Sequence, residues 1–246
     1  MRRSALVLLL IALSAQTWAQ TGTIRIVTEP WQPFMGPELP GGGFLPELVT
    51  AIFADSGLEV SIEFAPWARA LSMATSGAED GLLGAFRTAE RERLFLYPEA
   101  FGIVRTRLYA RADSEGSIGT LGELEGRAVG VVRGAAHGRE FDAAGSFIRI
   151  EVEDHETLVR MLLLGRCDVI AGPADVIEYL LRTRFRDEAE GVRATSPVLE
   201  ENAVYLAFSR AAPGAEKLRR LFDDGLARIV ADGTFAELAR RHGISW

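Results

Sequence analysis

Two arginines, Arg87 and Arg91, follow a short apolar run and are candidates for binding an anion. A guanidinium stays protonated and presents a planar fork of N–H donors, from which a carboxylate can accept two hydrogen bonds. Arg91 is the first candidate, although it could instead be a solvated charge or an ion-pair partner among its charged neighbours. Arg87, in the loop Gly84-Ala85-Phe86-Arg87, would suit a second acidic group or pair with Glu29. The two arginines thus predict a carboxylate site, with surface ion pairs as the alternative.

A glycine turn at Arg133–His137 offers a second possible anion site. It joins a predicted strand to a predicted helix start, where exposed backbone N–H groups attract negative charge. Gly134, Ala136 and His137 lie in this turn, and its glycine spacing is not a dinucleotide-binding fingerprint. His137, His155 and His242 are far apart and lack paired metal-ligand spacing, so we expect no metal site.

The first part of the chain alternates strands and helices. Apolar spacing predicts a strand, helix, strand, helix and strand at 24–26, 45–57, 58–64, 66–77 and 81–86. Such an alternation favours a parallel sheet with crossover helices.

A charged stretch at 111–120 interrupts this alternation, which then restarts. Strands are predicted at 128–132, 147–152, 167–171 and 203–208. Helices are predicted to begin after residue 134 and at residue 173, and to span 154–164, 215–231 and 235–241. The chain therefore contains two successive α/β units. Periodicity alone leaves open whether the two final helices return to the first unit.

The N-terminus has the features of a secretory signal peptide. Arg2 and Arg3 precede an apolar run at 5–13, and small residues near Ala19 suit cleavage. A membrane helix is the alternative. Without residues 1–19 the net charge falls from −7 to −9, which disfavours nucleic acid as a partner. Cys167 is the only cysteine, so no internal disulfide can form, and it is expected to be a small buried hydrophobe.

Six short motifs occur in a fixed order along the chain. They are Glu29-Pro30-Trp31-Gln32-Pro33-Phe34, Gly43-Phe44 with Glu47-Leu48, Pro66-Trp67-Ala68-Arg69-Ala70-Leu71, Thr88-Ala89-Glu90-Arg91, Leu121-Gly122-Glu123-Leu124-Glu125-Gly126 and Asp232-Gly233-Thr234. Together they resemble the bacterial extracellular solute-binding proteins of family 3, the periplasmic receptors of polar amino acid ABC transporters. The resemblance runs from about Thr23 to Gly243.

The resemblance implies the type II periplasmic-binding fold. This is an α/β fold of two lobes, each a mainly parallel sheet flanked by helices, with two hinge crossings and the ligand between the lobes. We expect the crossings near Val104–Leu108 and Leu199–Ala203. Lobe 1 would then be discontinuous, formed by 20–106 and 202–246, and lobe 2 would be 107–201.

The resemblance also implies roles for individual residues. Arg91 matches the arginine that anchors the ligand carboxylate, and Trp31 and Trp67 match aromatic residues placed against the ligand, with core packing as the alternative. Glu29 could receive a ligand ammonium. The family commonly places the acid for the α-ammonium where this chain has Pro173. Asp175 substitutes for that acid or only caps a helix.

We therefore expect a monomeric periplasmic protein that closes over a small carboxylate-bearing ligand, an amino acid or related organic acid. Its partner would be the membrane permease of an ABC transporter, bound transiently. We expect no catalytic residue, cofactor or nucleic acid. One alternative is a cyclohexadienyl dehydratase-like enzyme on the same fold, with Asp175, Glu178 or His137 as general acid. Another is a sensory ligand-binding domain.

Overall fold

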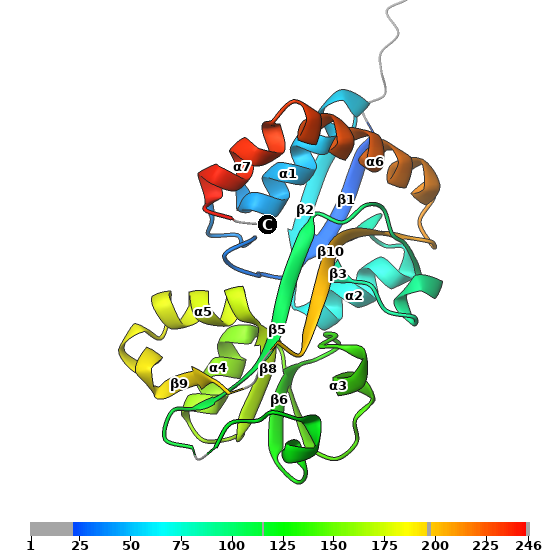
Figure 1. Cartoon of the computed structure of the whole chain (residues 1–246). Coiled ribbons are helices and arrows are strands. Elements are labelled where there is room, and N and C mark those ends of the chain that lie inside the picture. Colours follow the sequence, from blue (N-terminus) through cyan, green and yellow to red (C-terminus); the bar gives the residue numbers. More distant parts are fainter. Residues whose placement is uncertain (1–21, 115, 196–197, 245–246) are drawn as a thin grey trace, which may run out of the picture.

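The computed structural model describes residues 22–114, 116–195 and 198–244. The predicted signal peptide, residues 1–19, lies outside the described residues. Figure 1 shows two lobes, one above the other, joined by long strands. The α/β fold with two lobes that the sequence predicts is confirmed.

The upper lobe contains the first alternating unit. Strand β1 (Thr23–Thr28) lies between β2 (Glu59–Phe64) and β3 (Gly81–Phe86) and is parallel to both. Helices α1 (Phe44–Phe53) and α2 (Trp67–Ser76) make the crossovers. β3 is buried along nearly its whole length, as expected of an inner strand with helices on its faces.

The lower lobe repeats this arrangement. β6 (Ala128–Val132) lies between β7 (Ile148–Val152) and β8 (Val169–Pro173), and all three are parallel. Its larger helices are α4 (His155–Leu163) and α5 (Ala174–Thr183). The helix predicted directly after Gly134 begins only at residue 139, as the short α3 (Arg139–Ala143).

Two long strands run from one lobe into the other (Figure 1). β5 (Gly102–Arg111) and β10 (Glu200–Ser209) are antiparallel, with Gly102 opposite Val204 and Thr106 opposite Glu200. β10 also pairs with β3 of the upper lobe and β5 with β8 of the lower, so the sheet order is β2-β1-β3-β10-β5-β8-β6-β7. The predicted crossings fall in or directly beside these two strands.

Short elements complete the fold. The strands β4 (Phe95–Leu96) and β9 (Val192–Ala194) pair with β10 and β5. The 3-10 turns are η1 (Pro40–Gly42), η2 (Ala54–Ser56), η3 (Arg91–Arg93), η4 (Leu121–Leu124) and η5 (Arg186–Gly191).

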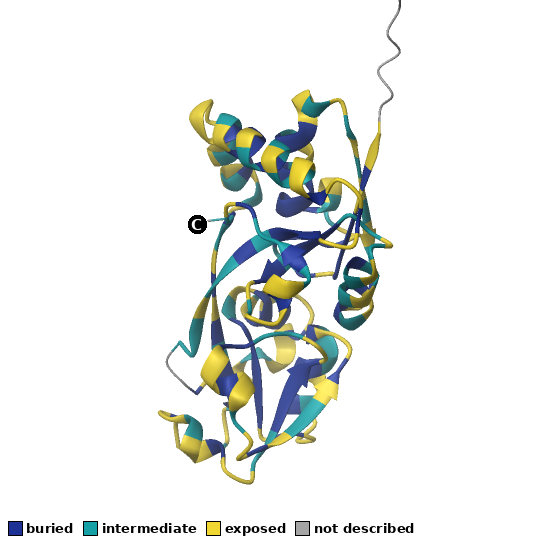
Figure 2. Cartoon of the chain, turned by 90° about the vertical axis from the view of Figure 1, so that its right-hand side faces the viewer, coloured by how far each residue is buried: buried dark blue, intermediate teal, exposed yellow. Residues whose placement is uncertain are grey.

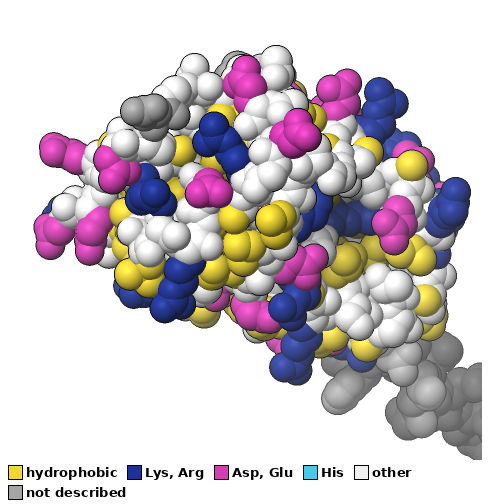
Figure 3. Space-filling view, turned by 90° about the horizontal axis from the view of Figure 1, so that it is seen from below, with side chains coloured by type: hydrophobic (Ala, Val, Ile, Leu, Met, Phe, Trp, Pro, Cys, Tyr) yellow, Lys and Arg dark blue, Asp and Glu magenta, His cyan; other side chains and the backbone are white. Residues whose placement is uncertain are grey.

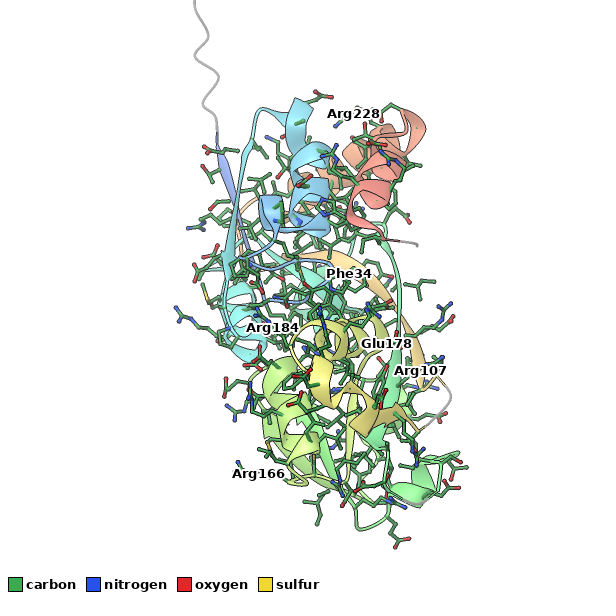
Figure 4. The ribbon with its side chains drawn as sticks, turned by 90° about the vertical axis from the view of Figure 1, so that its left-hand side faces the viewer. Phe34, Arg107, Arg166, Glu178, Arg184 and Arg228 are labelled. Atoms are coloured by element: carbon green, nitrogen blue, oxygen red, sulfur yellow. The ribbon has the colours of Figure 1, made fainter. Side chains whose placement is uncertain are left out.

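The C-terminal helices return to the upper lobe. α6 (Ala215–Ala231) and α7 (Thr234–His242) pack against α1, as Figure 1 shows. The rings of Phe53 and Phe222 lie 6.3 Å apart, and Arg228, labelled in Figure 4, donates to the Ala51 carbonyl at 2.8 Å. Gly225 permits this close packing because a Cβ there would lie 2.2 Å from the Ile52 carbonyl oxygen. The two final helices therefore pack on the first α/β unit, which the periodicity of the sequence could not decide.

Buried residues follow the sheet and the inner helix faces, while the outer helix faces are exposed (Figure 2). Phe34, labelled within the upper lobe in Figure 4, is 2 % exposed. Cys167 is also 2 % exposed, and burial raises the pKa of its thiol to about 11, so it is the buried hydrophobe that its apolar surroundings predict.

Candidate functional site

A pocket lies where the carboxyl ends of the parallel strands of the two lobes meet. This is the edge at which open α/β sheets usually bind ligands. The cavity between its walls is narrow, about 20 Å³, which is room for about one water molecule. The upper lobe contributes Glu29, Trp31, Trp67, Gly84, Phe86 and Arg91, and the lower lobe contributes Ala135, Ala136, His137, His155 and Pro173.

Arg91 is a buried cation in this pocket. It begins η3, just after β3, and is 6 % exposed. Its Nη1 donates to the Phe86 carbonyl at 3.1 Å and its Nη2 to the Gly134 carbonyl at 2.8 Å. Burial lowers the pKa of Arg91, while nearby Tyr97 and acidic groups oppose this effect, and arginine remains protonated in proteins. Within the described residues Arg91 has no salt bridge, so its charge is free to be matched by an anion.

The Gly134 carbonyl joins the two lobes. It accepts hydrogen bonds from Arg91 and, at 2.9 Å, from Nε1 of Trp67, so two donors of the upper lobe meet one acceptor of the lower. The Arg91 guanidinium also lies 5.2 Å from the Trp67 ring centroid. A peripheral contact adds to these, because Arg184 (labelled in Figure 4) reaches Glu38 at 3.3 Å. The lobes therefore touch across the pocket.

Glu29 and His155 face each other from opposite lobes. Glu29 follows β1, His155 is the first residue of α4, and each is 6 % exposed. Their Oε2 and Nδ1 atoms are 3.8 Å apart, beyond hydrogen-bonding distance. Burial, reinforced by Asp154 and opposed by Arg91, raises the pKa of Glu29 to about 8. Burial, reinforced by His137, lowers the pKa of His155 to about 4. At neutral pH the pair therefore holds one proton and has no net charge.

The glycine turn of the lower lobe already binds a carboxylate of the chain itself, that of Asp142. The backbone N–H groups of His137 and Gly138 donate to Asp142 at 3.0 and 3.3 Å. Burial tends to raise the pKa of Asp142, but the His137 side chain 3.5 Å away and the backbone N–H groups of His137 and Gly138 lower it overall. These two N–H groups therefore bind the chain's own carboxylate. The Gly134 carbonyl accepts hydrogen bonds from Arg91 and Trp67, so in this turn Gly134 acts as an acceptor and not as a donor.

Four predicted site residues do not line the pocket, and one of them, Gly134, borders it only through the hydrogen bonds that its carbonyl accepts from Arg91 and Trp67. Arg87 has a side chain 55 % exposed and pairs with Glu92 at 2.5 Å, not with Glu29. Ala85 is fully buried, because Gly84 and Phe86 on either side of it in β3 face the pocket. Asp175 is exposed in the first turn of α5.

The pocket also contains residues that the sequence did not single out as site residues. These are Gly84, Phe86, Ala135, His155 and Pro173. From the sequence, His155 is a candidate only for metal binding, and its spacing to the other histidines does not suit that role. The sequence does carry one indication that His155 belongs to the site. It lies one residue after the helix cap Asp154, beyond a predicted strand, and residues at that edge of a parallel sheet face the cleft.

The model of the bacterial extracellular solute-binding proteins, family 3, matches residues 24–244. The chain belongs to this family. A search of curated protein sequences gives no significant match.

Solved structures of this family's fold superpose well. A mutant of the arginine-binding protein ArgBP from T. maritima has a TM-score of 0.77 at 17 % identity, with 89 % of this chain and 94 % of that chain covered. The GluR0 ligand-binding core from Nostoc punctiforme, in complex with L-glutamate, has a TM-score of 0.74 at 18 % identity, with 89 % of this chain and 98 % of that chain covered. A histidine kinase sensor domain has a TM-score of 0.78 at 21 % identity, with 89 % of this chain and 95 % of that chain covered. These likenesses confirm the expected type II periplasmic-binding fold. In the described residues, no helix is both long and apolar enough to cross a bilayer.

Proposed function

We propose that this family member binds a small carboxylate-bearing solute between its lobes and delivers it to the permease of an ABC transporter. The observation that carries the proposal is Arg91, a buried cation without a carboxylate partner among the described residues, placed where both lobes meet. Phe86 and Gly134 carbonyls accept from two of its five N–H groups. A ligand carboxylate that accepts from this guanidinium would satisfy a charge that is costly to bury alone.

The aromatic walls of the pocket suit an organic ligand. The ring centroid of Trp31 lies 5.0 Å from that of Phe34 and 6.0 Å from that of Phe86. The Arg91 guanidinium lies over the Trp67 ring. Rigid rings supply apolar contact area and fix the ligand beside its charged anchor. The proposed contacts are Glu29, Trp31, Trp67, Phe86, Arg91, Gly134, Ala136, His137 and His155. Arg87, Ala85 and Asp175 are not part of this proposed site.

Hinge closure about β5 and β10 is the proposed mechanism. Lobe 1 is taken as 20–106 with 202–246, and lobe 2 as 107–201. A ligand that contacts both lobes favours the arrangement in which they touch, and the permease can recognise that arrangement.

Export to the periplasm by a cleaved signal peptide and a monomeric state belong to the same proposal. Nucleic acid is not among the proposed partners. The net charge is −7, and Figure 3 shows Lys and Arg side chains interspersed with acidic ones on the face it presents.

A dehydratase-like enzyme is a second candidate, favoured by one observation. Glu29 has a pKa raised by burial to about 8, so it holds a proton at neutral pH beside an anion anchor, as a general acid must. We propose binding without catalysis. Incubation of the purified protein with arogenate or prephenate should then yield no phenylalanine or phenylpyruvate, and turnover would overturn that proposal.

Calorimetry after a thermal-shift screen of amino acids, dicarboxylates and aromatic acids tests solute binding. For the best ligand, Arg91→Ala should weaken binding by about 2–5 kcal/mol, the cost of losing one partner of a desolvated charged hydrogen bond. Arg87→Ala is the matched control, since Arg87 is exposed and pairs with Glu92, and it should bind as the unaltered protein does. Equal affinity of the Arg91→Ala protein would remove Arg91 from the site.

A further inference from the structure

The pocket offers little to a ligand ammonium. An α-amino acid brings a positive charge next to its carboxylate, and a buried charge needs a partner of opposite sign. Among the described residues that line the pocket, Glu29 is the only acid. Asp175 is exposed on α5 outside the pocket, and the end of β8 that precedes it presents Pro173, whose side chain carries no charge and cannot accept a hydrogen bond.

Glu29 is not a free anion. His155 faces it from α4 at 3.8 Å, Asp154 at the cap of the same helix repels its negative charge, and Arg91 from η3 attracts it. His137 from the glycine turn opposes a positive charge on His155. Since the pKa of Glu29 is raised to about 8 and that of His155 is lowered to about 4, the pair keeps a single proton at pH 7. The pair therefore presents a neutral hydrogen-bonding surface.

The buried Nδ1 of His155 also has no hydrogen-bond partner among the described residues. A buried polar atom without a partner is costly, so a ligand group that bonds to it contributes to affinity. A hydroxyl can donate and accept, and an oxo group can accept from a protonated Glu29. The pocket thus combines one permanent cation, Arg91, with a neutral pair and aromatic walls.

On this basis, and resting on the proposed function, we propose that the solute is a monoanionic carboxylate with a hydroxyl or oxo group in place of an α-ammonium. Arg91 binds its carboxylate, and the Glu29–His155 pair hydrogen-bonds its neutral polar group. An amino acid would require the pair to release its proton, whereas a hydroxy acid or oxo acid would not.

Matched ligand pairs test this inference by calorimetry at pH 7. We would compare L-phenylalanine with phenyllactate and phenylpyruvate, and L-leucine with 2-hydroxyisocaproate, in two buffers of different ionisation enthalpy. We expect the hydroxy or oxo member to bind at least about tenfold tighter, a difference of about 1.4 kcal/mol, without proton release. Tighter binding of the amino acid, with proton release, would overturn the inference and leave the proposed function standing. Failure of every carboxylate in this set and in the wider screen would overturn both.

Two variants sharpen the test. Binding of the hydroxy acid should weaken between pH 7 and 9, where the pair loses its proton and becomes anionic, and Glu29→Gln should remove that pH dependence. Asp175→Ala should leave affinity unchanged, because Asp175 lies outside the pocket. A loss of amino-acid binding in the Asp175→Ala protein would show that Asp175 accepts an ammonium and would contradict the inference.

Discussion

Glu29→Gln should stabilise the protein at neutral pH, although it replaces a carboxyl group of the proposed site by an amide. The folded protein keeps the Glu29 carboxyl protonated because burial raises its pKa from the ordinary 4.5 to about 8. The unfolded chain ionises the same group above about pH 4.5. The folded state therefore binds the extra proton between these values, and the free energy of unfolding falls as pH rises through this window.

The size of the effect follows from the same shift. One pKa unit corresponds to about 1.36 kcal/mol, and pH 7 is about 2.5 units above the unfolded pKa of Glu29, which gives a cost of about 3 kcal/mol. Glutamine has nearly the same shape and carries no ionisable proton, so the Glu29→Gln protein avoids this cost. For a chain of this size that corresponds to roughly 6–12 °C in melting temperature.

Urea denaturation of the unaltered and Glu29→Gln proteins from pH 4.5 to 8.5 measures the difference. We expect near equality at pH 4.5 and an advantage for the glutamine variant that grows up to about pH 8 and then levels. Glu59→Gln, at an exposed position of β2, is the control and should change little. A Glu29→Gln protein less stable at pH 7 would refute the reasoning, since it would mean that Glu29 is ionised and paired with a protonated His155.

Two further changes test the lobe contact and the helix packing. Trp67→Phe keeps an aromatic ring but removes the 2.9 Å hydrogen bond to Gly134, so it should favour separated lobes by about 1 kcal/mol and enlarge the radius of gyration in X-ray scattering. An unchanged radius and ligand affinity would show that this bond does not hold the lobes together. Gly225→Ala should lower the free energy of unfolding by about 1–3 kcal/mol in urea, because the new Cβ would lie 2.2 Å from the Ile52 carbonyl oxygen. Gly145→Ala has open space and should be neutral, and a neutral Gly225→Ala protein would contradict the packing described.

The sequence predicted most of the fold because its signals are local. Alternating apolar residues and glycine stops placed the parallel strands of both lobes and most of their helices close to where they lie. The strand β5, which spans 102–111, was expected only as a crossing segment, because its partners β8 and β10 are distant in sequence. Pairing partners of that kind cannot be identified from the periodicity of one segment.

The candidate site was predictable only in part. Arg91 could be selected by its charge and motif, whereas the direction of Arg87 depends on Glu92 and Tyr97, which surround it only in the folded chain. The glycine turn did suit an anion, but Asp142 folds back to fill it. His155 gains its significance from Glu29 in the opposite lobe, a contact that no local pattern reveals.

A crystal structure with the tightest-binding carboxylate would show whether Arg91 anchors the ligand between the lobes. We predict that the ligand lies in the pocket between the lobes, with its carboxylate within hydrogen-bonding distance of the Arg91 guanidinium and its apolar part against Trp31 and Trp67. A carboxylate bound elsewhere, for instance at the exposed Arg87, with Arg91 still bonded only to the Phe86 and Gly134 carbonyls, would contradict it.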